Sequence, residues 1–320
     1  MDQKFKKFGC VGVLMGGYSS ERDVSLRSGK AILEALVAAG CDAKGVDIVS
    51  NDERVITKQI QDEKIDLAFI ALHGRLGEDG QIQKILEELA ISYTGSGVQA
   101  SQLSLNKVLS HMIFTQNGIK SPDYISLHQG DDFSADEIIK KLGGLFPLVV
   151  KPACEGSSIG VYFAVSKEAL IGAIESSWSF GDQVLIERFI RGRELTVGIL
   201  GDSCLPVIEI RPKRDFFDYT AKYQKGLTDY LIPAPIPEDV AVKVQQLALS
   251  AHKALGCADV SRVDVMLDQN NNAYVLEINT IPGFTETSLL PKAARQSGMD
   301  FQSLCLRLTE MAYGKSGKEN

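Results

Sequence analysis

Apolar and polar positions along the first hundred residues follow a pattern typical of an α/β domain. Apolar runs at residues 10–15, 43–49 and 65–72 have the length and composition of buried strands. Residues 25–40 and 79–90 carry apolar side chains at helical spacing. Because strands that alternate with helices favour a parallel sheet covered on both faces, we predict a doubly wound layer here.

The pattern becomes mixed near residue 120, where apolar runs follow one another more closely. A glycine-rich turn separates residues 147–153 from 160–166, so we predict that these two runs pair as strands. The other elements predicted between the first layer and residue 190 are a short strand at 91–97, a helix over 101–118, a helix over 167–178 and a strand at 183–190.

The last third of the chain contains one segment with no clean period. Residues 194–210 resemble a hairpin that turns at Gly201 and Asp202, but residues 211–238 are polar, aromatic and end in prolines. Loops of this length in compact domains are commonly lids or linkers. After it we predict a helix over 240–256, strands at 261–268 and 273–280, and a final helix.

Composition narrows the class of protein. The chain has 320 residues, of which 44% are hydrophobic and 23% charged, as in an average soluble protein. A net charge of −7 argues against a nucleic-acid binder with a broad basic surface. No CxxC pair occurs among the six cysteines, no apolar run reaches the roughly 18 residues of a membrane helix, and the N-terminus lacks a signal-peptide core. We therefore expect a cytoplasmic protein without disulfides, zinc or membrane spans.

Two short motifs suggest functions that their surroundings do not support. Residues 95–100, GSGVQA, fit a dinucleotide-binding pattern, but a helix rather than a second strand with an acidic residue follows. Residues 156–160, GSSIG, fit a nucleophile elbow with Ser158 as nucleophile, but a strand follows where the elbow requires a helix. His252 is the one histidine downstream, and its place within a predicted helix favours a packed or surface residue.

Oxygen-bearing side chains lie on one face of the last two predicted strands. Glu277 and Asn279 alternate with apolar residues in VLEIN, and Arg262 and Asp264 share a face of RVD. If the two strands form a hairpin, Asp264 can converge with Glu277 and Asn279. Three oxygen ligands without His or Cys favour Mg²⁺, commonly shared with phosphates. The alternative is a solvated strand face.

Two further groups of residues are compatible with a nucleotide. Lys151 ends an apolar strand, and the small-residue loop 155–160 after it could cradle phosphate with its backbone N–H groups. Glu187 and Glu194 lie seven residues apart and would suit adenine and ribose hydroxyls. The alternatives are an ordinary Gly-Ser hairpin and a surface charge pair.

The order of these groups resembles the ATP-grasp superfamily, and further motifs resemble the D-alanine–D-alanine ligase family. The motifs lie between residues 12 and 291: GGYSSERDVSLRSG, HGRLGEDGQIQ, GSGVQASQLSLNK, KPACEGSSIGV, IRGRELTV, YTAKYQKGLTDYLIPA, RVD and EINTIPGFTETSLLP. The resemblance implies an ATP-grasp fold preceded by the doubly wound parallel domain. Its implied domains are residues 1–98, 99–186 and 187–320, the last carrying a lid at 211–238.

The resemblance also implies the reaction. An ADP-forming ligase of this family joins two D-alanines through an acylphosphate, for peptidoglycan precursor synthesis. ATP and two Mg²⁺ (or Mn²⁺) would be required, and the expected partners are small molecules, not nucleic acid or membrane. A homodimer is expected. Two alternatives stay open: a ligase with another second substrate, D-serine or D-lactate, and a non-catalytic nucleotide-binding module.

For the nucleotide, the resemblance assigns roles residue by residue. Asp264, Glu277 and Asn279 would hold the metal ions. Phosphate contacts would come from two lysines and from the loop that closes over them, and the base and ribose would lie against the strand after that loop. The residues implied are Lys107, Lys151, Ser158 and Lys222 for the phosphates, Glu187, Arg188, Phe189 and Ile190 for adenine, and Glu194 for the ribose.

For the amino acids, the resemblance places an oxyanion site at the end of the last strand. Arg262 and the Gly283 N–H would stabilise the tetrahedral intermediate, and Ser288 with the Leu289 N–H would bind the second carboxylate. Glu21, near His73, would hold the first ammonium group. Tyr223 would link Ser157 and Glu21 and hold the lid closed, excluding water from the acylphosphate. A tyrosine there favours an amine as second nucleophile.

Three positions depart from the family pattern. The family commonly has Asp-Lys where this chain has Asn106-Lys107, a second lysine where it has His111, and glycine where it has Lys84. We interpret His111 as a surface helix residue that does not carry a full charge at pH 7.5. These departures bear on nucleotide affinity rather than on the metal or oxyanion groups.

Overall fold

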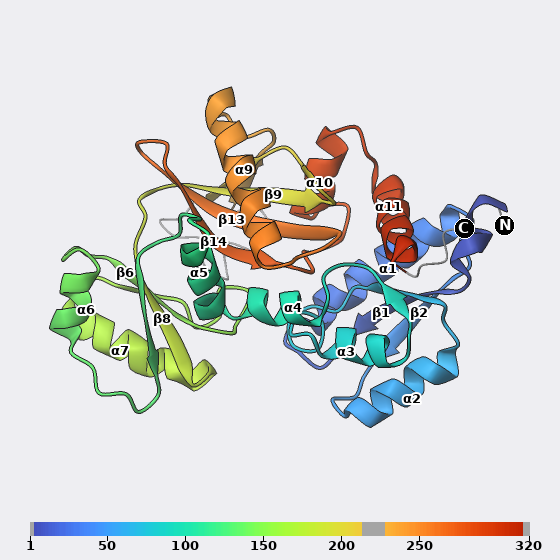
Figure 1. The fold of residues 1–320 in the computed structure, drawn as a ribbon, viewed down its shortest axis with the longest axis horizontal. Helices are drawn as coiled ribbons and strands as arrows, with labels where there is room; N and C mark the ends of the chain where they lie inside the picture. The colour runs from blue at the N-terminus through green and yellow to red at the C-terminus, as the bar shows by residue number, and fades with distance from the viewer. Residues whose placement is uncertain (1–2, 213–227, 316–320) are drawn as a thin grey trace.

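The computed structural model describes residues 3–212 and 228–315 and arranges their strands in three sheets (Figure 1). The first sheet is parallel and has the order β2-β1-β3-β4. Its order and direction confirm the predicted doubly wound layer. Its strands are β1 (Val11–Gly16), β2 (Ala43–Ile48), β3 (Leu67–Ile70) and β4 (Ser92–Tyr93).

Helices cover both faces of this first sheet (Figure 1). Val11 and Val13 of β1 pack in one core cluster, and Leu14 packs in the cluster on the other face, as a period of two requires. The first face carries α1 (Arg22–Ala38) and α11 (Phe301–Gly314), and the second carries α2 (Glu53–Glu63) and α3 (Gln81–Glu88). The sequence pattern did not predict α2, which begins at the side-chain cap that Asp52 gives to the Arg54 N–H.

The single helix predicted over 101–118 is wrong, because the structure breaks it at Asn106. There α4 (Val98–Leu105) ends and α5 (Lys107–Gln116) begins. Asn106 has extended backbone angles, and its side-chain oxygen accepts a hydrogen bond from the Leu109 N–H at 3.1 Å. A side-chain cap of this kind stabilises a helix start, so Lys107 begins a new helix at the edge of the cavity described below.

The second sheet is antiparallel, with the order β5-β8-β6-β7, and α6 and α7 pack against it (Figure 1). The pairing of β6 with β7 confirms the prediction for residues 147–166. The pattern missed β5 and α6, which are short. The elements are β5 (Tyr124–His128), α6 (Ala135–Lys141), β6 (Leu148–Pro152), β7 (Tyr162–Ala164), α7 (Lys167–Ser177) and β8 (Gln183–Arg188).

The third sheet has the order β12-β11-β9-β13-β14, with β10 also paired to β9. Its antiparallel β13–β14 pair and the turn at Gly201 confirm two predicted hairpins. The α9 helix packs against β9, β13 and β14 through a shared core cluster. The elements are β9 (Gly192–Leu200), β10 (Ser203–Cys204), β11 (Ile208–Pro212), β12 (Thr228–Leu231), α9 (Glu238–Ala254), β13 (Val260–Asp268) and β14 (Ala273–Asn279).

Two predictions for this region need correction. The segment 211–238 is not irregular at its ends, because β11 extends to Pro212 and pairs with β12. Its interior, residues 213–227, lies outside the described residues. The predicted final helix is two helices, α10 (Leu289–Gln296) and α11, separated at Gly298, whose φ of +85° suits glycine. The domain division at residues 98 and 186 remains a proposal.

Candidate active site

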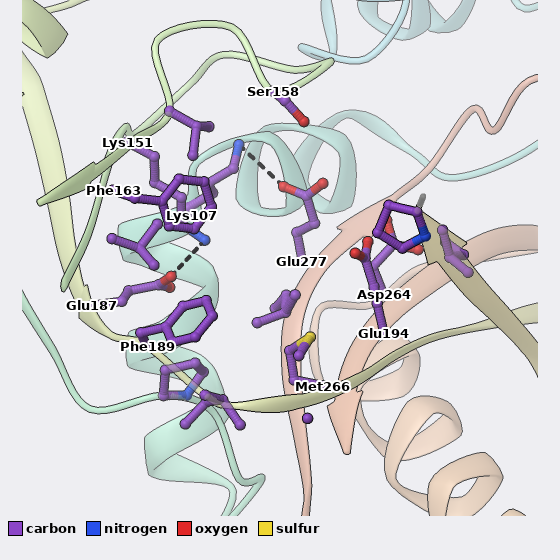
Figure 2. Close-up of a pocket in the computed structure, with 18 of the residues that line it drawn as sticks. Lys107, Lys151, Ser158, Phe163, Glu187, Phe189, Glu194, Asp264, Met266 and Glu277 are labelled. Atoms are coloured by element: carbon purple, nitrogen blue, oxygen red, sulfur yellow. Dashed lines mark ion pairs between the residues drawn. The ribbon is translucent and has the colours of Figure 1, made fainter. Parts of the chain in front are cut away.

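Two cavities lie between the sheets and meet along one wall. The nucleotide cavity, about 330 Å³, separates β6, β7 and β8 from β9, β11, β13 and β14 (Figure 2). The substrate cavity, about 600 Å³, extends from that wall to α1, His73 and the start of α10. Seven residues line both: Lys107, Glu155, Ser158, Glu194, Ile210, Asp264 and Glu277.

The predicted metal-binding residues come together on the β13–β14 hairpin. Asp264 is the register partner of Glu277, and Arg262 is the partner of Asn279. The side-chain oxygen of Asn279 accepts a hydrogen bond from the Ile281 N–H at 2.9 Å, which orients the amide at the strand end. Two carboxylates and one carboxamide form an all-oxygen set, which suits a hard divalent cation such as Mg²⁺.

Arg262 and Asp264 form a buried pair beside that set. The Arg262 Nε and Nη2 atoms donate to the two carboxylate oxygens of Asp264 at 2.9 and 2.7 Å. Burial by itself lowers the pKa of Arg262, but the Asp264 charge outweighs it and raises the pKa above its usual value. Thr196 of β9 also donates to Asp264, at 2.6 Å. The guanidinium therefore stays charged and fixed at the wall of the substrate cavity.

The two predicted phosphate lysines approach the cavities from different elements (Figure 2). Lys107, at the start of α5, donates from Nζ to the Glu155 carbonyl at 2.6 Å and lies 3.4 Å from Glu277 Oε2. Lys151 of β6 lies 2.9 Å from Glu187 Oε2. Both lysines are buried, and each has a carboxylate beside it, which offsets the cost of burying the ammonium group.

The interpretation of His111 as a surface residue is wrong. Its side chain is fully buried, and its ring packs edge-on against Tyr124 with a centroid separation of 5.0 Å. The Nε2 atom lies 3.2 Å from Glu187 Oε1. Burial lowers the pKa of His111, more than the Glu187 charge raises it. The ring is therefore neutral near pH 7, as expected, and its contact with Glu187 is not a salt bridge.

The loop between β6 and β7 contacts the N-terminal part of the chain. Ser157 donates from Oγ to Glu21 Oε1 at 2.6 Å, so two of the three residues of the predicted Tyr223 link are in contact. Ser157 and Ser158 both have positive φ, at 54° and 59°. Positive φ at both residues makes this loop a tight turn, and successive backbone N–H groups in a turn can face an anion. Arg75 also donates to Glu155 on this loop, at 3.1 Å.

His73 joins the first sheet to the end of β14. Its Nδ1 lies 3.0 Å from the Ile281 carbonyl, and its Nε2 lies 3.1 Å from Ser28 Oγ. The ring is buried and lines the substrate cavity with Glu21. The first-substrate end of the cavity is thus assembled from α1, from the loop after β3 and from the end of β14.

The opposite end of the substrate cavity is the N-terminus of α10. Ser288 precedes its first residue, Leu289, and the Ser288 hydroxyl accepts a hydrogen bond from the Thr285 N–H at 3.1 Å. Gly283 lies nearby: a Cβ there would be 3.3 Å from Ser288 Oγ. The N–H groups of a helix N-terminus attract carboxylates, so this end suits the carboxylate of an amino acid.

Apolar side chains line the base end of the nucleotide cavity (Figure 2). Phe189 packs edge-on against Phe163 at 5.9 Å between ring centroids, and Ile190 is buried beside them. Arg188 donates to Asp123 at 2.9 Å, which anchors the strand end. Met266 of β13 lies on the facing wall. A flat apolar slot with Glu187 at its edge suits a purine base.

Several contacts of the site escaped prediction. Thr196 and Ser28 act through Asp264 and His73, and Arg75 acts through Glu155. Each is distant in sequence from the residue it contacts, so no local motif could identify it. For Thr196 a signal did exist, because a polar β-branched residue inside the apolar strand LTVGIL requires a hydrogen-bond partner.

The motifs that we discounted behave as expected. A strand, β7, follows the GSSIG loop, so Ser158 lacks the helix of a nucleophile elbow. His252 is buried, with Nδ1 2.7 Å from Ser261 Oγ. Lys84 is exposed, pairs with Glu53 at 2.9 Å and lines neither cavity. The predicted lid residues Lys222 and Tyr223 lie outside the described residues.

Family models match most of the chain. A model described as D-ala D-ala ligase C-terminus matches residues 113–310, and one described as D-ala D-ala ligase N-terminus matches residues 47–96. None of the helices in residues 3–212 and 228–315 is long and apolar enough to cross a membrane.

Named relatives and solved structures agree with these models. A D-alanine–D-alanine ligase of Trichlorobacter lovleyi is 44% identical over 96% of both chains, and one of Desulforudis audaxviator is 45% identical over 94% of this chain and 98% of its own. The Bacillus anthracis D-alanine–D-alanine ligase complexed with ATP superposes with a TM-score of 0.84 at 35% identity, covering 97% of this chain and 99% of that one. The Enterococcus faecalis VanG D-Ala:D-Ser ligase gives 0.80 at 28% identity, covering 95% and 99%. The chain therefore belongs to the D-alanine–D-alanine ligase family and has its ATP-grasp fold.

Proposed function

We propose that the protein is an ADP-forming ligase that joins two D-alanines to D-alanyl-D-alanine for peptidoglycan precursor synthesis. The observation that carries this proposal is the shared wall of the two cavities. Lys107, the loop carrying Ser158 and the carboxylates of Asp264 and Glu277 line both, so a phosphoryl group and an amino-acid carboxylate can meet there. The carboxylate of the first D-alanine attacks the γ-phosphorus of ATP, ADP leaves, and the acylphosphate forms.

The nucleotide cavity divides the contacts with ATP among four groups of residues. The slot beside Phe163 and Met266 takes the adenine ring, with Glu187 and the backbone from Arg188 to Ile190 at its edge. Glu194 reaches the ribose hydroxyls. Lys107, Lys151 and the loop carrying Ser158 surround the phosphates, where fixed positive charge and backbone N–H groups offset the phosphate charge.

The residues present fit the divalent metal that this family requires. Asp264, Glu277 and Asn279 provide oxygen donors only, and Asp264 and Glu277 are register partners at the wall shared by both cavities. Mg²⁺ or Mn²⁺ held there would neutralise phosphate oxygens and orient the γ-phosphoryl group. The nearby cations Lys107 and Arg262 already compensate the two carboxylates.

The second step takes place at the end of β14. The second D-alanine loses a proton from its ammonium group, and the free amine attacks the acylphosphate carbonyl. The tetrahedral intermediate then collapses to the amide as its bond to phosphate breaks. Arg262 and the Gly283 N–H are placed to stabilise the oxyanion of that intermediate. Ser288 and the Leu289 N–H hold the second carboxylate, while Glu21 and His73 hold the first substrate.

The proposal also includes the lid, whose residues Lys222 and Tyr223 lie outside the described residues. We keep the assignments of Lys222 to the γ-phosphate and of Tyr223 to the link between Ser157 and Glu21. The observed 2.6 Å hydrogen bond between Ser157 and Glu21 supports the link that Tyr223 would extend. We also keep the cytoplasmic location and the homodimer as proposals, and sedimentation equilibrium of the purified protein tests the dimer.

Phosphate release with product analysis tests the function. The protein is incubated with ATP and Mg²⁺ plus D-alanine, L-alanine, or D-alanine with D-serine or D-lactate. We expect D-alanine-dependent phosphate release matched one to one by D-alanyl-D-alanine. Phosphate release with only a mixed product would move the second site to another acceptor. Folded, ATP-binding protein without turnover would instead favour a non-catalytic nucleotide-binding module.

A further inference from the structure

A buried histidine contacts the carboxylate at the base end of the nucleotide cavity. His111 of α5 is 0% exposed and has its Nε2 atom between two acceptors from different sheets. One is Glu187 Oε1 of β8, 3.2 Å away, and the other is the Leu276 carbonyl of β14, 3.3 Å away. Glu187 belongs to the proposed adenine edge, and Leu276 precedes the proposed metal ligand Glu277.

The surroundings of the ring determine which nitrogen carries the proton. Both neighbours of Nε2 are acceptors, so Nε2 must be the N–H. Nδ1 is buried and has no hydrogen-bond partner among the described residues. Protonating it would place a charged donor without an acceptor in an apolar environment, next to the Phe114 and Tyr124 rings. The ring therefore works as a neutral Nε2–H donor.

Glu187 has one oxygen fixed and one oxygen available. Lys151 Nζ lies 2.9 Å from Oε2. Oε1 is buried and has His111 Nε2 at 3.2 Å, but in the described part of the chain no donor is aligned with it in hydrogen-bond geometry. A buried carboxylate oxygen without a donor is costly, because it loses its hydration without replacement. The donor nearest to Oε1 in the described residues is His111 Nε2, whereas the amino group of a purine base can reach the side of the carboxylate that lines the cavity.

We propose that His111, as the neutral Nε2–H tautomer, is a positioning residue that fixes the Glu187 carboxylate for the amino group of the nucleotide base. Its N–H faces Oε1 at 3.2 Å from the buried side, so the side of the carboxylate that lines the cavity is left to the base. The same N–H reaches the Leu276 carbonyl, so it also joins the adenine edge to the strand that carries Glu277. This inference rests on the proposed binding of ATP in this cavity.

The neutral state of His111 makes nucleotide binding sensitive to acid. The charged groups around the ring are Glu187 on β8, Lys151 on β6 and Lys107 on α5 itself, and Tyr124 faces it from β5. A proton on His111 would add a third cation to Lys107 and Lys151 and would draw the Glu187 carboxylate away from the base. Because burial lowers the pKa of His111, we expect the KM for ATP to rise only in acid below the range in which an ordinary histidine titrates.

Two substitutions separate positioning from packing. In His111→Gln, the amide nitrogen can reach the place of Nε2 and donate to the same acceptors, whereas His111→Leu retains the apolar volume without a donor. We expect H111L to raise the KM for ATP about tenfold, with kcat at saturating ATP changed less than about twofold. The KM of H111Q for ATP should stay within about threefold of that of the unsubstituted protein. This variant should also lack the increase of KM in acid that His111 contributes.

The assay is steady-state kinetics in ATP from pH 5.5 to 8.5, with direct titration of ATP binding and thermal unfolding of each variant. The γ-phosphate of ATP titrates in the same range, so the comparison is the difference between the unsubstituted and H111Q profiles. Equal KM values for all three proteins, or equal losses in H111Q and H111L, would overturn the inference. An unsubstituted protein that binds no ATP would instead refute the proposed function.

Discussion

Replacing Arg262 with lysine tests the oxyanion assignment most directly. Lysine keeps the positive charge but lacks the planar guanidinium group with its several N–H donors. Arg262 donates two of its five N–H groups to Asp264, at 2.9 and 2.7 Å, and forms no other hydrogen bond within residues 3–212 and 228–315. Three N–H groups are therefore left for a substrate. Lysine offers one ammonium group, which cannot hold Asp264 and face an oxyanion in the same geometry.

The structure sets the size of the expected effects. Loss of one oxyanion donor typically lowers kcat by about 10²- to 10³-fold. The variant also loses one of two charge-assisted hydrogen bonds to Asp264, which costs about 2 kcal/mol of stability, while Thr196 still donates at 2.6 Å. Arg262→Met would leave Asp264 buried without a cation and cost about 3–5 kcal/mol, so lysine is the better test.

The assay is ATP- and D-alanine-dependent phosphate release, with thermal unfolding and ATP titration. We expect kcat to fall about 10²-fold or more in R262K, with the affinity for ATP within about threefold. The matched control is Arg22→Lys: Arg22 holds Asp47 by two bonds of 2.8 Å and lines neither cavity. R22K should keep kcat within about twofold. A R262K variant with nearly full kcat, or one that loses ATP binding instead, would refute the oxyanion role.

Three further predictions concern the metal, the loop contact and acid stability. Glu277→Gln should lower kcat by about 100-fold or more with an unchanged unfolding temperature, measured at several Mg²⁺ concentrations; substantial activity would exclude Glu277 as a ligand. Ser157→Ala removes the 2.6 Å hydrogen bond to Glu21 and should raise the KM for D-alanine about tenfold while ATP affinity is kept; an effect on ATP alone would contradict it. Burial lowers the pKa of His252 to about 4. Between pH 6.5 and 4 the His252 ring therefore stays largely neutral in the folded protein, whereas in the unfolded chain it takes up a proton. The free energy of unfolding should therefore fall by about 3 kcal/mol between pH 6.5 and 4. His252→Asn can keep the hydrogen bond to Ser261 but cannot be protonated, so denaturant titrations of this variant should lack that fall.

Local patterns predicted the parts of the site that lie within one or two neighbouring elements. The alternation in VLEIN placed Glu277 and Asn279 on one face, and the short turn before it brought Asp264 opposite Glu277, as the strand register shows. The Gly-Ser loop between two apolar runs likewise indicated the β6–β7 turn. In these cases the period and the turn determine the neighbours, so no long-range information is needed.

The errors arose where a local signal competes with a tertiary one. Residues 101–118 carry apolar side chains at helical spacing, but Asn106 caps a second helix and ends the first. His111 has the polarity of a surface residue, and only the position of β8 and β14 around α5 shows that it is buried. A histidine that can be neutral is tolerated in such a place where a permanently charged residue would need a second carboxylate.

The first-substrate end of the cavity shows why the active site depends on all three sheets. Glu21 begins α1, but the contact that orients it comes from Ser157, on the loop of the second sheet. His73 follows the first sheet, but its Nδ1 contacts the carbonyl of Ile281, beyond the last strand of the third sheet. A shift of the second or the third sheet would therefore disturb the first-substrate site directly, even if the first sheet did not move. For this reason we expect nucleotide binding, which contacts the second and third sheets, to order the site for the first amino acid.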